Sequence, residues 1–290
     1  MTRIASSPIL VVSLWAITTA WNWAGFDPRA EALRNYQARF VVLPRADIAR
    51  AASLGFRSVA SDLYWIAAVN YFGDQRNDQV SYAELYNHLE LVVSLDPDFE
   101  YPYLFGGISL PWNTGKGWLN IDEAISLLER GVKRFPDSWR LRFQLAYTYS
   151  TFRDRFKDAG DQLAAVALLP GSPDYVGRLA TRMYATAGQY DAAMMLAEHL
   201  ASSIDDPKVK GRLLRRAAEA RTVREVLRLE ELVKRFFEVH HHFPAALGDL
   251  VSAGFLSSLP VDELGGTFEY NSATGEVQSS MLHDRLRIHR

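Results

Sequence analysis

Residues 187–200 read Ala-Gly-Gln-Tyr-Asp-Ala-Ala-Met-Met-Leu-Ala-Glu-His-Leu. A glycine that can end one helix is followed by an aromatic residue, and a pair of alanines opens the next helix. The same order of residue types recurs at 121–136, which ends Arg-Phe-Pro, and at 89–97, which ends Leu-Asp-Pro. The recurrence predicts a row of helical hairpins, with small residues where helices cross closely and a proline after the second helix of each pair.

This pattern resembles the tetratricopeptide repeat (TPR) over about residues 50–220, and we predict TPR-like helical repeats over residues 48–221. It implies a mainly α fold, a TPR-like α-solenoid that binds or scaffolds other proteins. Small residues are expected at the close helix crossings because a larger side chain would hold the neighbouring helix away. The residues expected there are Gly107, Gly131, Ala146 and Ala193.

The composition is that of an ordinary globular protein. The 290 residues are 48% hydrophobic and 23% charged, with a formal net charge of -2. A length of this order suffices for one solenoid and small additions. The near-neutral charge argues against a nucleic-acid partner. Because cysteine is absent, the chain has no disulfide, no thiolate nucleophile and no cysteine-based zinc site.

Residues 8–26 carry no charge, and their number lies within the ~17–25 residues that a membrane-spanning helix needs. Trp21 and Trp23 lie near one end of this run, as interfacial aromatic residues do. We therefore predict that residues 1–26 form a membrane anchor, followed by a linker over residues 27–47. A cleaved signal peptide and a buried helix of a soluble protein are the alternatives.

The orientation of the anchor is read from the charges around it. Arginines that follow the run favour a cytoplasmic body by the positive-inside rule, whereas the short basic start before the apolar run is typical of an export signal. We expect a single-pass protein of the inner (cytoplasmic) membrane with a periplasmic body, partly because of a C-terminal resemblance described below.

The region that follows the linker is expected to be a helix over residues 48–72, with apolar residues at spacings of three and four. Its second half, residues 64–72, is apolar on most faces and is expected to be largely buried. Asp62 lies inside this helix. We expect its carboxylate to be buried and therefore paired or hydrogen-bonded.

The C-terminal third changes character. Residues 208–219 are expected to cap the repeats, and residues 222–243 to form a separate amphipathic helix with a capping box at Thr222 and Glu225. Residues 244–280 have the pattern of a short helix followed by a β-hairpin, which predicts a small α+β module. A basic tail, 281–290, ends the chain. The module is expected to pack on the preceding helix through Phe236, Phe237, Leu250 and Phe268.

This C-terminal stretch resembles the tail of type II secretion pseudopilins, in which a long helix leads into a Pro-x-x-Leu-x-x-Leu segment, a Leu-Pro-x-Asp-x-x-Gly loop and a small hairpin. The resemblance covers fewer than ~50 residues and implies an envelope setting. The matching residues are Pro244, Leu247, Leu250, Leu259, Pro260, Asp262, Gly265 and Tyr270.

Residues with catalytic or metal-binding chemistry are few. Three adjacent histidines, His240 to His242, point about 100° apart on a helix and cannot all face one metal, so a polar helix end is favoured over a metal site. The Gly-Lys-Gly at 115–117 lacks the first glycine and the final Ser or Thr of a phosphate-binding loop. We therefore expect a protein that is not an enzyme and needs no cofactor.

The candidate partner-binding residues are aromatic and basic. Aromatic side chains in helical repeats mostly fill the core, and the others can anchor a bound protein. A basic stripe is often only a solvated surface. The expected function is a membrane-anchored scaffold in the assembly or stabilisation of a bacterial-type envelope complex, with a subunit of a secretion, pilus or polysaccharide-export machine as the alternative. The candidate residues are Trp112, Trp118, Tyr101, Tyr103, Arg212, Arg215 and Arg216.

Overall fold

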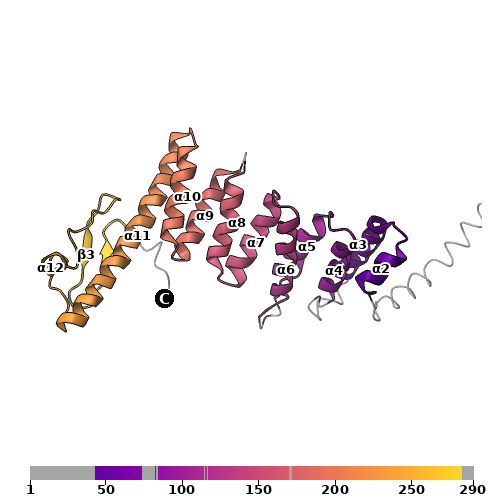
Figure 1. The fold of residues 1–290 in the computed structure, drawn as a ribbon, viewed down its shortest axis with the longest axis horizontal. Helices are drawn as coiled ribbons and strands as arrows, with labels where there is room; N and C mark the ends of the chain where they lie inside the picture. Colours follow the sequence, from indigo (N-terminus) through magenta and orange to yellow (C-terminus); the bar gives the residue numbers. More distant parts are fainter. Residues whose placement is uncertain are drawn as a thin grey trace, which may run out of the picture. The chain divides into compact units, whose positions relative to one another are not determined.

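A computed structural model describes residues 43–73, 82, 84–113, 115, 117–169 and 172–282. The chain is mainly helical over these residues, with two short antiparallel hairpins, which confirms the predicted fold class at this level (Figure 1). It forms two compact units, Met1–Ala52 and Ser53–Arg290, and each is described by itself. The first unit contributes one described helix, α2 (Ala46–Ala52).

The second unit contains the other helices and strands of the described residues. They are α3 (Arg57–Gly73), α4 (Leu85–Leu95), α5 (Tyr101–Ser109), β1 (Trp112–Asn113), β2 (Trp118–Leu119), α6 (Ile121–Arg134), α7 (Trp139–Phe152), α8 (Phe156–Ala167), α9 (Asp174–Thr186), α10 (Tyr190–Ser202), α11 (Pro207–His240), α12 (Gly248–Ser252), β3 (Phe268–Tyr270) and β4 (Val277–Ser279).

Helices α3 to α11 pack in the order of the chain. Each helix contacts the next, and α5 also contacts α7, as α9 does α11. Contacts limited to close neighbours in sequence are compatible with an α-solenoid of helical hairpins. We call α3 to α10, together with α11 as far as Ala220, the helical array.

Local sequence explains where several helices begin and end. Helix α4 ends at Leu95, before the predicted Asp-Pro stop. Ser138 caps α7, and its Oγ accepts a hydrogen bond from the backbone N–H of Leu141 at 3.4 Å. Asp206 caps α11 by accepting from the backbone N–H of Lys208 at 2.8 Å, and Pro207 occupies the first turn. A proline there costs no helical hydrogen bond.

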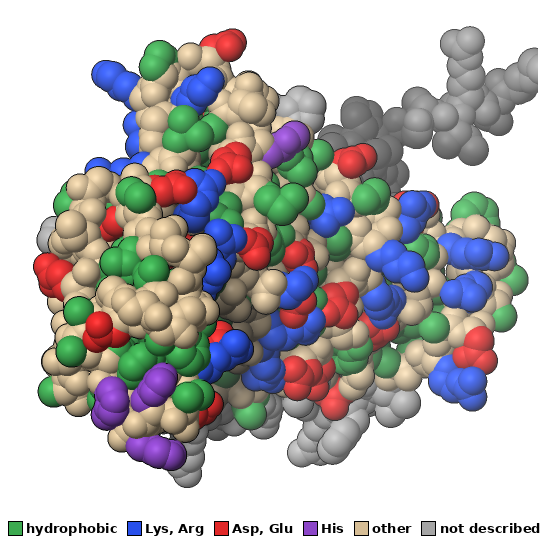
Figure 2. All heavy atoms as spheres, turned by 60° about the vertical axis from the view of Figure 1, so that its left-hand side comes forward, with side chains coloured by type: hydrophobic (Ala, Val, Ile, Leu, Met, Phe, Trp, Pro, Cys, Tyr) green, Lys and Arg blue, Asp and Glu red, His purple; other side chains and the backbone are tan. Residues whose placement is uncertain are grey.

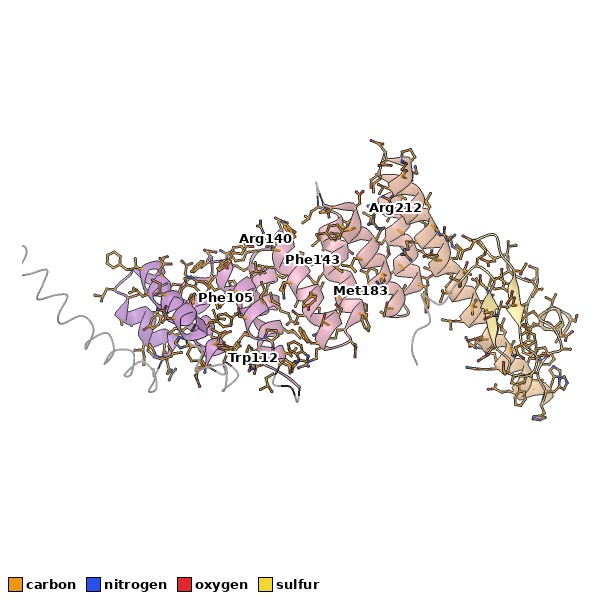
Figure 3. All side chains as sticks on the ribbon, turned by 180° about the vertical axis from the view of Figure 1, so that it is seen from behind. Phe105, Trp112, Arg140, Phe143, Met183 and Arg212 are labelled. Atoms are coloured by element: carbon orange, nitrogen blue, oxygen red, sulfur yellow. The ribbon has the colours of Figure 1, made fainter. Side chains whose placement is uncertain are left out.

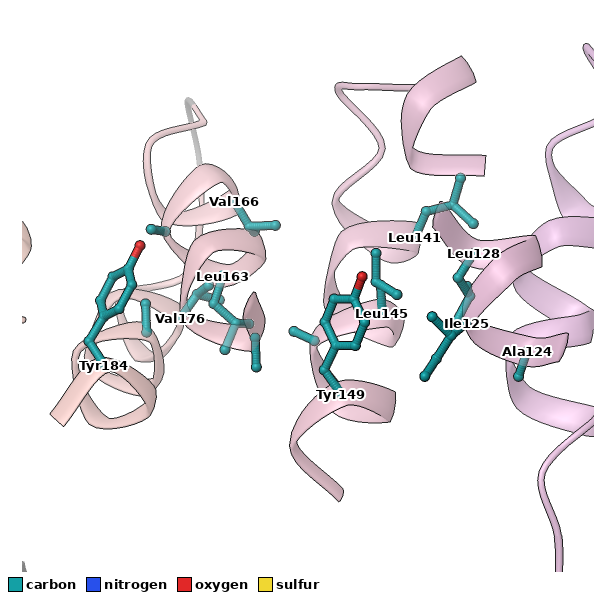
Figure 4. Close-up of a cluster of buried hydrophobic side chains, with 14 of the residues drawn as sticks. Ala124, Ile125, Leu128, Leu141, Leu145, Tyr149, Leu163, Val166, Val176 and Tyr184 are labelled. Carbon is teal, nitrogen blue, oxygen red and sulfur yellow. The ribbon is translucent and has the colours of Figure 1, made fainter. Parts of the chain in front are cut away.

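The array core is built from the facing sides of successive helices. Figure 4 shows Leu141 and Leu145 of α7 directed towards Leu128 of α6, and all three are buried. Tyr149 and Tyr184 are buried with them. The Tyr149 hydroxyl donates to Glu129 at 2.5 Å, and the Tyr184 hydroxyl donates to Asp161 at 2.8 Å. These two phenols are thereby satisfied, as most buried polar groups are.

Glycine and alanine lie at the helix crossings, as predicted. A Cβ at Gly107 would lie 2.5 Å from Leu128 Cδ2, and one at Gly131 would lie 2.8 Å from Tyr103 Cβ. Ala146 and Ala193 are buried. The two glycine crossings leave no room for a larger side chain.

The prediction of one helix over residues 48–72 was wrong. Two helices, α2 and α3, are separated at Ser53–Phe56. Leu54 and Gly55 both have positive φ, 48° and 95°, a conformation that interrupts a right-handed helix. The spacing of apolar residues continues across this break, so periodicity alone did not reveal it.

The expected burial of this region was also wrong. Asp62 is exposed, and within residues 64–72 both Ile66 and Val69 are exposed. Asp62 therefore needs no buried partner. The apolar residues on this side of α3 are not part of the array core.

The C-terminal region is more continuous than predicted. A single 34-residue helix, α11, replaces the expected cap and separate amphipathic helix. Thr222 is buried within it, and its hydroxyl donates to the Asp262 carboxylate at 3.1 Å instead of capping a helix. Val209 to Ala220 of α11 belong to the array core, and Leu229 to Phe236 belong to a second core.

That second core holds the C-terminal module, residues 244–280. The predicted hairpin is present, with Phe268 opposite Ser279 and Tyr270 opposite Val277. Leu247, Leu250 and Val277 are buried against α11. Phe236 and Phe268 pack there as predicted, whereas Phe237 is partly exposed and contacts the ring of Phe243.

Asp262 joins the module to α11. Its carboxylate is buried and accepts hydrogen bonds from the hydroxyls of Thr222, at 3.1 Å, and Ser279, at 2.6 Å. It also accepts from the backbone N–H of Leu264 at 2.9 Å. One side chain therefore connects the long helix, the loop and the second strand of the hairpin.

The predicted anchor at residues 8–26 lies outside the described residues, as do the first part of the linker and the last eight residues. Within the part of the chain that the structure describes, no helix combines the length and apolar character needed to cross a bilayer.

Candidate protein-binding surface

The two tryptophans predicted as anchors lie on the β1–β2 hairpin, where Asn113 pairs with Trp118. Trp112 is half-buried, and its ring meets that of Tyr82 edge-on at 4.9 Å. Trp118 is more exposed and rests against Phe152 at 4.8 Å. Of the two tryptophans, Trp118 has the larger solvent-exposed surface, whereas Trp112 lies mostly against the edge of the hydrophobic core.

Tyr101 and Tyr103, both on α5, have opposite environments. Tyr101 is 55% exposed, whereas Tyr103 is 3% exposed. The Tyr103 ring packs against Gly131, and its hydroxyl donates to the Pro97 carbonyl at 3.3 Å. The prediction of Tyr103 as a partner-binding residue was therefore wrong, because this side chain fills a helix crossing.

The three predicted arginines are exposed on α11. Arg215 and Arg216 both pair with Glu219, at 3.3 and 2.6 Å. Arg212 has no carboxylate partner among the described residues. The basic stripe is therefore partly neutralised, and Arg212 keeps the most available charge.

A larger surface emerges when the exposed sides of α5, α7, α9 and α11 are compared. Each helix places exposed or half-buried residues at positions i, i+3, i+4 and i+7, which share one face of an α-helix. We call these residues the odd-helix face. They are Tyr101, Leu104, Phe105 and Ile108 on α5; Arg140, Phe143, Gln144 and Tyr147 on α7; Tyr175, Arg178, Leu179 and Arg182 on α9; and Arg212, Arg215, Arg216 and Glu219 on α11.

Contacts join these faces in two pairs, α5 with α7 and α9 with α11. The Gln144 amide on α7 donates to the Gly107 carbonyl on α5 at 3.2 Å. Arg182 on α9 and Arg216 on α11 line the same small hollow. In Figure 3 the labelled residues Phe105, Arg140 and Arg212 lie along α5, α7 and α11.

The chemistry of the odd-helix face changes from one helix to the next. All four positions on α5 are apolar or aromatic, α7 and α9 mix aromatic or apolar residues with arginine, and α11 has only charged residues. The face therefore passes from apolar to basic along the array. A partner segment would meet anchoring rings at one end and cations at the other.

The arginines of this face on α7 and α9 differ from several others in the array. Arg130 pairs with Glu90 and Arg153 with Asp122. By contrast, no carboxylate of the described residues lies within ion-pair distance of Arg140, Arg178 or Arg182; the Arg140 guanidinium lies instead 5.2 Å from the Trp139 ring. Unpaired guanidinium groups can bind carboxylates of a partner through two parallel hydrogen bonds.

The adjacent histidines lie at the end of α11, and Figure 2 shows histidine side chains gathered at one corner of the face turned forward. His240 and His242 pack near the Phe236 ring, at 4.3 and 5.6 Å between ring centroids. Within the described residues, no group of three His, Asp or Glu side chains is placed to hold a metal ion.

Comparison with known proteins gives no relative for this chain. No family model, no curated protein and no solved structure matches it.

Sequence reasoning missed Arg140, Arg178 and Arg182. The signal was present as the same four-residue spacing on four helices, but it emerges only when the helices are aligned by their buried small residues. Whether each arginine finds a carboxylate elsewhere in the fold could not be read from its neighbours in sequence.

Proposed function

We propose that this chain is a TPR-like α-solenoid that acts as a membrane-anchored scaffold and binds a protein partner through the odd-helix face. The observation that carries the proposal is the change from apolar to basic residues along that face, where Arg140, Arg182 and Arg212 have no carboxylate partner among the described residues. The repeated Ala and Gly signature, the close crossings at Gly107 and Gly131 and the order of helix contacts support the repeat architecture.

The binding mechanism is geometric. Phe143 and Tyr147 on α7 supply rings that can bury against a partner, and aromatic and arginine side chains are the usual high-energy positions of protein interfaces. Arg178 and Arg182 supply charge on the next odd helix. A segment that combines apolar anchors with carboxylates, in that order along the array, fits this surface.

The cellular setting in the proposal comes from residues 8–26. A helix that spans the inner membrane would hold the array beside membrane partners and raise their effective concentration. We place the body in the periplasm, where the scaffold would assist assembly or stability of an envelope complex. The proposal is of a binding protein and not an enzyme, without a cofactor or a nucleic-acid partner.

The C-terminal module supports the alternative of a dedicated subunit of a secretion, pilus or polysaccharide-export machine. Its Leu-Pro-x-Asp loop resembles that of pseudopilins, and Asp262 organises the module as described. Leu259 and Val261 of the same loop are exposed. An exposed apolar loop on a braced module is suited to docking in a larger assembly.

The test is co-purification of the full chain from detergent extracts, followed by identification of bound proteins. The variant Arg140→Glu/Arg182→Glu/Arg212→Glu reverses the odd-helix face. Its matched control, Arg57→Glu/Lys133→Glu/Lys234→Glu, makes the same change of net charge at exposed cations elsewhere. We expect the first variant to lose a partner at least tenfold while the control retains it. Equal retention by both would refute binding at this face.

A further inference from the structure

The outer side of α3 is an apolar surface that nothing in the array covers. Phe56, immediately before α3, and Val59, Leu63 and Ile66 on it are 54–70% exposed. Their spacing places them in one stripe on the same side of the helix, with the exposed Asp62 at its edge. We call these four residues the α3 stripe. Monomeric soluble proteins rarely leave such a contiguous set of large apolar side chains in water.

The opposite side of α3 holds it to the array. The Ser61 hydroxyl donates to the Val92 carbonyl on α4 at 3.1 Å, and Ala68 is buried. Trp65 meets Phe105 of α5 edge-on, at 5.1 Å between ring centroids. The α3 stripe therefore points away from α4 and α5, at the position where a further hairpin would stack. Terminal repeats of solenoids normally present a polar outer surface there.

The charge of the adjoining chain indicates what covers the stripe. Between residues 27 and 57 there are six arginines but only three acidic residues. The segment directly follows the uncharged run at residues 8–26. An excess of arginine next to a membrane span is attracted to anionic lipid headgroups. A second copy of this chain would bring the same excess of positive charge and would not neutralise it.

We propose that the α3 stripe lies on the anionic surface of the membrane, with Val59, Leu63 and Ile66 in the interfacial region of the bilayer. This inference rests on the proposed anchor at residues 8–26. A helix with one apolar face and flanking arginines has the character of interfacial helices that lie in the plane of the membrane. Docking at the α3 stripe would hold the first hairpin of the array at the lipid surface.

The absence of cysteine allows each position to be labelled uniquely. Full-chain Leu63→Cys would carry an environment-sensitive nitrobenzoxadiazole label and be reconstituted in phosphatidylcholine–phosphatidylglycerol vesicles with spin-labelled lipid. Met195→Cys is the matched control, because Met195 is a 71% exposed apolar residue on α10. We expect quenching by lipid at position 63 to exceed that at position 195 at least threefold, and to fall in vesicles of phosphatidylcholine alone.

Flotation of the same vesicles measures the anchor separately. If the chain floats with the vesicles but the label at position 63 is quenched no more than that at 195, the inference fails and the anchor stands. A blue-shifted label at 63 that spin-labelled lipid does not quench would show burial against protein and also overturns the inference. If the chain does not float, the anchor and the inference both fail.

Discussion

The two ends of the helical array are finished in different ways. At the N-terminal end, α3 presents Val59, Leu63 and Ile66 to solvent. At the C-terminal end, α11 covers α10 with buried residues such as Leu213 and presents arginines outward. Among the described residues, the C-terminal end is closed by a polar surface of the chain and the N-terminal end is not. The N-terminal end has the character of a contact surface, because removing its exposed apolar side chains from water would be favourable.

The largest expected effect compares a leucine of the second core with one at the N-terminal end of the array. Leu229→Ala removes a fully buried side chain from the second core and should lower the free energy of unfolding by ~2–5 kcal/mol. Leu63→Ala removes an exposed side chain of the α3 stripe. It should change the free energy of unfolding by no more than ~0.5 kcal/mol in detergent solution. Denaturant titration of both variants measures the difference. Similar losses would mean that the α3 stripe is buried.

A second comparison uses glycines inside the array and at its N-terminal end. Gly107→Leu would force Leu128 aside and should cost ~1–3 kcal/mol. Gly73→Leu, at the end of α3, meets open space within 4 Å and should be nearly neutral. Thermal midpoints of the two variants test the contrast. A midpoint unchanged by Gly107→Leu would contradict the close crossing of α5 and α6.

A third comparison uses one carboxylate of the C-terminal module and one at the N-terminal end of the array. Asp262→Ala leaves the hydroxyls of Thr222 and Ser279 without their acceptor, so the C-terminal module should lose ~1–3 kcal/mol. Asp62→Ala changes an exposed residue of α3 and should have little effect. Hydrogen exchange of the β3–β4 amides reports the local loss. Unchanged protection in Asp262→Ala would mean that the hairpin is held by its apolar contacts alone.

The smallest expected effect is a pH dependence at the N-terminal end. His88 on α4 is buried, Nδ1 has no hydrogen-bond partner, and burial lowers the pKa of the imidazole below its usual 6.5. Because the unfolded chain then binds the proton more readily, stability is complete above pH ~6.5 and declines as pH falls towards the folded pKa, by at most ~1.4 kcal/mol per pH unit.

His88→Phe should remove this dependence, whereas His199→Gln, at an exposed histidine of α10, should leave it unchanged. Unfolding titrations at pH 7 and pH 5 would show both effects. If His88→Phe loses as much stability between pH 7 and pH 5 as the unsubstituted protein does, the pH dependence comes from other groups.

The features that sequence predicted well depend on local chemistry. The stop of α4 before Asp96-Pro97 and the turn between β3 and β4 follow from proline and from alternation within a few residues. The small residues at helix crossings were also recognisable, because the repeats present them in the same place. Each of these features is determined by residues within its own short segment of the chain.

The features that sequence missed depend on distant neighbours. Val59, Leu63 and Ile66 have the spacing of a buried face, and the pattern is the same whether or not a helix covers it. Tyr101 and Tyr103 differ only in which side of α5 they occupy. A capping box at Thr222 was plausible by residue type, but the hydroxyl is bonded to Asp262, forty positions away.

Helix α11 has a consequence for how this protein can be dissected. The helix continues from the array core to the second core without a loop, through Thr222, Val226 and Leu229. A protease that needs an unfolded segment finds none at this junction, so limited digestion should cut elsewhere. Any fragment designed to separate array from module must end within a helix and will bare a row of apolar side chains. The array and the module are therefore joined by one continuous helix. A force applied to the module is transmitted to the array through the backbone hydrogen bonds of α11.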